Sequence, residues 1–208
     1  MKKTIGIVAV VITTLILSAA FIWTDFHIST SQTKIESQVN TYGFTGQTSE
    51  KLPPELPLQI YVEGDDLFSR ALRDQLSKRL EAIPRFNQVS ILNEISILGA
   101  QPQNSNPSIL VVNSSESGHR WTPIYGRSQF TVNLIFASDG DISWRNDKVV
   151  RMNNAIAVQV VRISADFTVQ DSTFGLISRI YYNRYLADQV ATQIASSLSS
   201  SVEAQVNQ

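Results

Sequence analysis

Residues 58–83 constrain the fold more than any other stretch, because they predict a strand that runs directly into an amphipathic helix. Apolar and polar side chains alternate over 58–63, and this period of two gives a strand one apolar face. Asp65 or Asp66 is then suited to cap a helix, since a carboxylate accepts a free backbone N–H there. The helix carries an apolar stripe at Phe68, Leu72, Leu76 and Leu80. Pro84 ends it, so strand and helix must share one core.

Composition excludes several classes of function. The 208 residues carry 17 Lys and Arg against 18 Asp and Glu, so the formal charge is −1 and no basic excess points to nucleic acid. The absence of cysteine excludes disulfides, thiol catalysis, cysteine metal sites and lipid attachment through cysteine. The chain has no phosphate-binding loop, no dinucleotide motif and no cluster with metal-ligand spacing. We therefore expect neither a cofactor nor a metal.

The N-terminus predicts attachment to a membrane. Two lysines precede an uncharged segment over residues 4–23, and about 20 apolar residues are what a helix needs to cross a bilayer. Lysines before this segment and none just after it favour a cytoplasmic N-terminus. We expect residues 1–24 to be a single-pass anchor in the inner membrane, with the C-terminal domain in the periplasm. The alternative is a signal peptide cleaved after the small residues 18–20, which would release the domain to the periplasm or the outer membrane.

The rest of the chain predicts one domain. Residues 25–57 are expected to be a linker, because they are rich in Ser, Thr and Gln and end in prolines. The domain is expected over 58–202, with a frayed tail over 203–208. Strands are predicted within 89–98, 109–112, 130–137, 142–152 and 158–170, and a polar hairpin loop over 113–125. From Thr173 onward the apolar spacing indicates a long second helix.

This order predicts an α+β fold, a two-layer sandwich with a mostly antiparallel sheet and two amphipathic helices on one face, plus the N-terminal transmembrane helix. Strand 158–170 shows the two faces most clearly, since Ile163, Ala165, Phe167 and Val169 point to one side. The opposite face is predicted to carry Arg162, Asp166, Gln170 and Asn133. That face is therefore either wet or a binding surface.

Several motifs resemble one known family. They are YGF at 42–44 with Gly46, LP at 52–53 before the strand, and SRALRDQL at 69–76 in the first helix. These motifs, together with a strand over 130–136 and ADQ at 187–189 in the last helix, resemble the LPS-assembly lipoprotein family, LptE. The resemblance implies a small sheet with two helices, no catalytic site, and binding to a β-barrel membrane protein and to lipopolysaccharide through basic residues. Arg120 or Arg127 matches such a residue. Tyr42 stands where the family has its acylated cysteine, and the anchor segment precedes it.

Residue types that are enriched at interfaces occur in two places. One is RIYYNRY at 179–185; the alternative there is that the tyrosines cover the sheet and the arginines stay in solvent. The other is the predicted hairpin, where an aromatic on a loop tip is hard to explain by packing. The candidate partner-binding residues are Arg120, Trp121, Tyr125, Arg127, Arg179, Tyr182 and Arg184. His119 lies near serines, but a flexible hairpin supplies no fixed base, so we expect no catalytic residue.

The sequence therefore predicts a non-enzymatic envelope accessory protein that binds a membrane protein or a lipid headgroup. The alternative is a structural subunit of a multiprotein envelope machine, such as a secretion, pilus or motor apparatus. Such a subunit would pack by protein–protein contacts, for instance by adding a strand to an exposed sheet edge.

Overall fold

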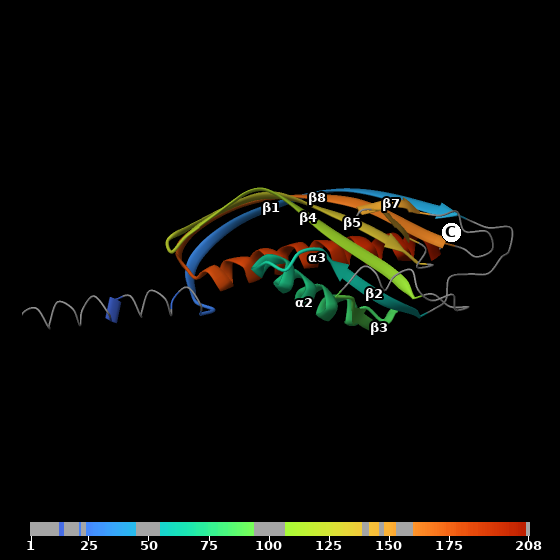
Figure 1. Cartoon of the computed structure of the whole chain (residues 1–208), viewed down its shortest axis with the longest axis horizontal. Helices are drawn as coiled ribbons and strands as arrows, with labels where there is room; N and C mark the ends of the chain where they lie inside the picture. The colour runs from blue at the N-terminus through green and yellow to red at the C-terminus, as the bar shows by residue number, and fades with distance from the viewer. Residues whose placement is uncertain are drawn as a thin grey trace, which may run out of the picture.

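A computed structural model of the chain describes residues 13–14, 21, 24–44, 55–93, 107–138, 142–145, 148–152 and 160–206. Within these residues the fold is α+β, which confirms the predicted class (Figure 1). Six strands form one sheet in the order β1-β8-β5-β4-β2-β3, and two more form a separate hairpin. The sheet strands are β1 (His27–Phe44), β2 (Leu56–Val62), β3 (Phe86–Ile91), β4 (Ser108–Thr122), β5 (Tyr125–Ala137) and β8 (Val160–Ile177). The hairpin is β6 (Ile142–Arg145) and β7 (Lys148–Met152), and the helices are α2 (Leu67–Glu81) and α3 (Arg179–Val206).

The core lies between the sheet and the two helices, which cover the same face (Figure 1). Helix α2 begins at the expected cap, since Asp66 Oδ1 accepts hydrogen bonds from the amides of Phe68 at 2.8 Å and Ser69 at 3.1 Å. Its predicted stripe is confirmed, because Leu72, Leu76 and Leu80 are fully buried. The alternation in β8 is also confirmed, with Ile163, Ala165, Phe167 and Val169 buried under the helices.

The sheet is mixed rather than mostly antiparallel throughout. Strands β1, β8, β5 and β4 pair antiparallel, whereas β2 pairs parallel with both β3 and β4. The parallel pairing of β2 with β3 arises because α2 connects them, and a helical crossover returns the chain in the same direction. The prediction of a mostly antiparallel sheet therefore holds for β1, β8, β5 and β4 and fails for β2 and β3.

The predicted linker over 25–57 is wrong for residues 27–44. These residues form β1, an edge strand that pairs with β8 over its whole length. Hydroxyls share its inner face with Ile35, which packs against the core, and with Val39. Thr33 donates to buried Asp171, and Ser31 accepts from Thr173. Most inward-facing positions of the strand are therefore polar, as the outward-facing ones are. The sequence for this reason shows no regular alternation of apolar and polar residues here. The domain starts at this strand and not at residue 58.

Other boundaries differ from prediction for related reasons. The expected polar loop over 113–125 is wrong, since β4 continues to Thr122 and the turn is only Pro123 and Ile124. One face of this hairpin is open to solvent, so its strands need no apolar residues there. Helix α3 begins at Arg179 rather than near Thr173, because β8 runs to Ile177. Residues 142–152 form two short strands instead of one.

Most of the predicted membrane segment lies outside the described residues, as do residues 45–54 and the last two residues, 207–208, of the tail predicted over 203–208. The prediction of a frayed tail is wrong for residues 203–206, which belong to α3. No helix within the described part of the chain has both the length and the apolar character needed to cross a bilayer.

Candidate binding site

The β4–β5 turn marks the end of the sheet where the predicted contact residues come together. Arg120, Trp121, Tyr125 and Arg127 flank this turn. The last residues of β8 lie beside it, since the amide of Ile177 donates to the carbonyl of Pro123 at 2.9 Å. Helix α3 starts directly after β8, so its first turns lie at the same end of the molecule. The seven residues divide between three environments, namely the open sheet face, the core and the helix surface.

Two arginines stand side by side on the open face, away from the helices. Arg120 on β4 and Arg127 on β5 are direct cross-strand partners, so their side chains lie on the same face. Both are exposed, and neither forms an ion pair within the described part of the chain. Like charges placed directly opposite each other destabilise a sheet, so this pair presents a cationic site with no internal counter-charge.

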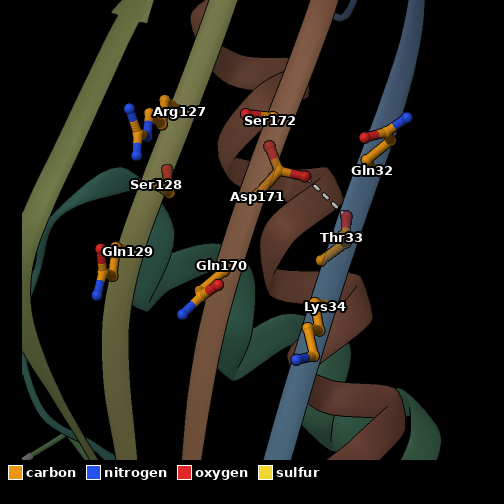
Figure 2. A pocket seen from close by; sticks show the side chains of 9 residues that line it. All are labelled: Gln32, Thr33, Lys34, Arg127, Ser128, Gln129, Gln170, Asp171 and Ser172. Atoms are coloured by element: carbon orange, nitrogen blue, oxygen red, sulfur yellow. Dashed lines mark hydrogen bonds between the residues drawn. The ribbon is translucent and has the colours of Figure 1, made fainter.

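A shallow hollow of about 320 Å³ lies beside this pair over β5, β8 and β1 (Figure 2). The rows of the sheet place Lys34, Gln170 and Gln129 in one line across the strands, and Gln32, Ser172 and Arg127 in the next. These side chains offer a guanidinium, an ammonium, amides and a hydroxyl to one region of surface. Such groups can donate to phosphate oxygens and exchange hydrogen bonds with sugar hydroxyls. Lys34 also pairs with exposed Glu36, whose pKa it lowers.

Three of the four residues predicted for the open face are exposed. Asp166, Gln170 and Asn133 are exposed, and the Asn133 amide donates to the Asp166 carboxylate. Arg162, predicted to belong to this face, is only 2% exposed. It lies in register with Ala137, next to a second small apolar cluster that includes Ile109. The polar hollow therefore occupies the half of the face nearer the β4–β5 turn.

Two predicted contact residues lie in or against the core instead. Trp121 faces the helices, packs half-buried against the core, and donates from Nε1 to the carbonyl of Ile177 at 3.2 Å. Tyr182 is completely buried beneath Gly126, where an added Cβ would come within 2.6 Å of the ring. The interpretation of Trp121 as an aromatic on a loop tip is wrong, because no loop exists there. Both residues hold the hairpin against α3.

A buried network around Asp171 fixes this end of the domain. Its carboxylate, 4% exposed, accepts hydrogen bonds from Thr33 at 2.7 Å, Thr173 at 2.9 Å and Tyr182 at 2.8 Å. The Thr33 hydroxyl also contacts the Tyr185 hydroxyl at 2.7 Å. Burial raises the pKa of the Tyr182 hydroxyl well above its usual value, so the hydroxyl remains a donor. The network thereby links edge strand β1 to β8 and α3.

His119 and Ser128 do form a contact, although the sequence predicted a flexible hairpin without one. The His119 Nδ1 and Ser128 Oγ atoms are 2.8 Å apart, and Ser128 Oγ is also 3.0 Å from the Tyr182 hydroxyl. Ser128 is 1% exposed and faces the helix layer. A nucleophile must reach its substrate, so this geometry is suited to anchoring α3 rather than to acyl transfer. No group of three His, Asp or Glu within the described residues could hold a metal ion.

The remaining predicted contacts lie on the surface. Tyr125 stacks at a tilt on Phe174, with ring centroids 4.7 Å apart. Arg179 is exposed at the first residue of α3, and Arg184 forms an ion pair with Asp25 just before β1. Sequence reasoning missed Gln32 and Lys34 because β1 lacks an apolar period, and it missed Asp171 because the strand was predicted to end at residue 170. The only available signal was the charged or amide residue at every second position of 32–38.

Comparisons with known proteins give no family. No protein-family model matches the chain, and neither does any curated protein. Among solved structures, the PelC dodecamer from Paraburkholderia phytofirmans is similar with a TM-score of 0.37 and 12% identity, over 79% of this chain and 97% of that one. A neuraminyllactose-binding hemagglutinin homolog from Helicobacter pylori has a TM-score of 0.36 and 12% identity, over 79% and 97%. Likenesses this distant carry no argument about function.

Proposed function

We propose that this chain is a non-enzymatic accessory protein of the cell envelope, attached to a membrane by residues 4–23. Its open sheet face binds an anionic headgroup of the lipopolysaccharide type, in an LptE-like role beside a membrane-protein partner. The Arg120–Arg127 pair carries the proposal. A phosphate bound between the two guanidiniums removes their mutual repulsion and accepts charge-assisted hydrogen bonds from both. The LptE resemblance suggested one such arginine, and the sheet register provides two.

The neighbouring hollow supports a sugar phosphate over a bare anion. Gln129 and Gln170 place amides beside the arginines, and Ser172 adds a hydroxyl. Amide and hydroxyl groups exchange hydrogen bonds with sugar hydroxyls in both directions. The contact between His119 and Ser128 lies on the helix side of the sheet, so no base pairs with the Ser172 hydroxyl in the described part of the hollow. The face is therefore arranged for binding without chemistry.

The test is the affinity of the full chain, in mild detergent, for a deacylated diphosphorylated glucosamine disaccharide. Replacing both arginines, Arg120→Gln and Arg127→Gln, should weaken binding about tenfold per arginine, because a hydrogen bond to a charged group contributes about 1.5 kcal/mol. Binding should also weaken as salt increases, since the contact is exposed. Lys78→Gln on α2 is the matched control, because it removes one exposed charge far from this face. Absence of binding, or equal loss in the control, would contradict the proposal.

A second candidate, the structural subunit, is favoured by one observation. Strand β1 is 18 residues long and lies at the edge of the sheet, and among the described residues only β8 pairs with it. A long edge strand presents unpaired backbone groups to which another chain can add a strand. In that case the chain should form oligomers whose mass, measured by light scattering in detergent, rises with concentration. A constant monomeric mass would leave headgroup binding as the function.

A further inference from the structure

Five of the seven large apolar side chains that are exposed in the described residues gather at one end of the domain. They are Phe26, Ile28, Ile124, Phe174 and Leu176, and we call them the apolar end. Pairing brings them together, because Ile28 is the cross-strand partner of Leu176 and the amide of Gly175 donates to the carbonyl of Ile124. Ile124, at the β4–β5 turn, is 64% exposed. Exposed apolar clusters of this kind mark contact surfaces.

The backbone at this end is built to hold the strands close. Gly175 has a φ of +120°, and an added Cβ would lie 2.3 Å from the carbonyl oxygen of Ile28. Only glycine tolerates both the conformation and the approach. The adjacent Ser178 amide donates to the Phe26 carbonyl at 2.9 Å, which fixes the start of β1 against β8. The apolar end is therefore a rigid surface rather than a set of loose side chains.

The position of the chain's N-terminal segment identifies what covers this surface. Phe21, the last described residue before Thr24, packs edge-on against Phe26 with ring centroids 5.6 Å apart. Phe21 belongs to the uncharged segment 4–23, so the described end of this segment contacts the apolar end. Figure 1 shows the start of β1 and the β4–β5 turn at the same end of the domain. Any membrane that this segment enters must lie next to these five side chains.

We propose that the apolar end rests in the interfacial layer of the same bilayer that residues 4–23 enter. Apolar and aromatic side chains gain by partial burial at the boundary between headgroups and acyl chains. The last cross-strand pair before the β4–β5 turn is Thr122 and Tyr125. The Arg120–Arg127 pair lies two residues farther from the turn, which is about 7 Å along the strand. That distance places both guanidiniums at the level of the phosphates, where long cationic side chains reach lipid headgroups. The bilayer then orients the domain and delivers lipid headgroups to the open face.

This inference rests on the membrane attachment in the proposed function, and the test separates the two. Because the chain has no cysteine, Ile124→Cys gives a single site for an environment-sensitive fluorophore. The full chain is reconstituted in vesicles of phosphatidylcholine and phosphatidylglycerol, and flotation establishes its attachment. We expect a blue shift of the label's emission, and loss of most of that emission when the lipids carry brominated acyl chains.

Ile91→Cys is the matched control. Ile91 is also exposed and apolar, but it lies near the opposite end of the sheet. Ile91 and Leu110 are both partners of Ile60 on β2, so they lie in one row across the strands. Leu110 is 12 residues along β4 from Thr122, which precedes the turn. At about 3.3 Å per residue, the two label sites are about 40 Å apart. Its label should keep its emission with brominated lipid. If both labels keep the same fraction of their emission when the floating vesicles contain brominated lipid, the inference is overturned, while the attachment still holds.

Two further outcomes are also decisive. A blue shift at residue 124 without quenching by brominated lipid would mean that protein, such as a second copy, covers the apolar end, and would refute the bilayer contact. A chain that fails to float would refute attachment and contact together. Headgroup affinity in detergent would still decide, independently, whether the open face binds its ligand.

Discussion

Replacing Tyr182 by Phe tests whether the Asp171 network stabilises the domain. The substitution removes one hydroxyl and keeps the ring that fills the space beneath Gly126, so it creates no cavity. The lost hydrogen bond has a carboxylate acceptor that is 4% exposed. Such a bond contributes about 1.5–3 kcal/mol, and we expect Tyr182→Phe to lower the free energy of unfolding by about 2 kcal/mol. The substitution also removes the 3.0 Å contact with the Ser128 hydroxyl. Thr33 and Thr173 still donate to the carboxylate, and His119 still contacts Ser128, so neither buried group is left without a partner.

The assay is urea unfolding of the full chain in mild detergent, followed by circular dichroism. The transition midpoint should fall while the slope of unfolding free energy against urea stays unchanged, because the folded state exposes no new surface. Tyr125→Phe is the matched control, since its hydroxyl has no hydrogen bond within the described residues and its loss should cost less than about 0.5 kcal/mol. If both variants lose the same stability, the buried network contributes nothing beyond packing.

Alkaline pH tests whether the same hydroxyl is buried, because burial is the main cause of the raised pKa of Tyr182. Because the pKa of Tyr182 is raised in the folded protein, the folded state keeps a proton that the unfolded state loses above its ordinary pKa of 10. The stabilisation is therefore complete below pH 10 and declines as pH rises beyond it. We expect wild type to lose up to about 1.4 kcal/mol per pH unit more than Tyr182→Phe between pH 10 and 12. Parallel pH profiles of the two proteins would refute this assignment.

Three further predictions concern neighbouring parts of the fold. Gly126→Ala should destabilise the domain by about 1–3 kcal/mol in the same urea assay, because the new methyl meets the Tyr182 ring, whereas Gly118→Ala has no neighbour within 4 Å and should change little. Asp66→Ala should remove about 1 kcal/mol through loss of the α2 cap. Burial raises the pKa of Asp66, but hydrogen bonds from the first helical turn outweigh this and leave it below 3.8, so the cap's contribution should persist at neutral pH and fade in an acid titration only below that value. Arg127→Gln should raise the free energy of unfolding by a few tenths of a kcal/mol, and the thermal midpoint with it, because it removes the repulsion between Arg127 and Arg120. A lower midpoint would contradict the view that the two arginines repel each other.

The sequence predicted elements well wherever one face is apolar. The stripe of α2, its Asp66 cap and the alternation of β8 follow from local spacing, because burial against one core imposes the period of the element on the residues. The prediction of element type failed where the buried face of a strand carries polar side chains. The inner face of β1 carries Ser31 and Thr33, whose partners are distant in sequence, and no local pattern reveals a hydroxyl that will meet a carboxylate 138 residues away.

The candidate site was predicted by composition and corrected by geometry. Counting Arg, Trp and Tyr selected residues from two separate segments, and the fold brings both segments to one end of the domain. It could not tell Arg120 from Trp121, although neighbouring residues of a strand point to opposite faces. The strand register settled this difference by turning Trp121 into the core and leaving Arg120 beside Arg127 on the open face.

By itself, the sequence determined the α+β class, the two helices and the apolar segment that precedes the domain, since all three depend on local periodicity and hydropathy. Tertiary structure alone decided that β1 completes the sheet, that parallel and antiparallel pairings mix, and that two arginines face each other. It also decided that Ile28, Ile124 and Leu176 meet at the end where the N-terminal segment joins. These are contacts between residues far apart in the chain, and they exist only after the strands have paired.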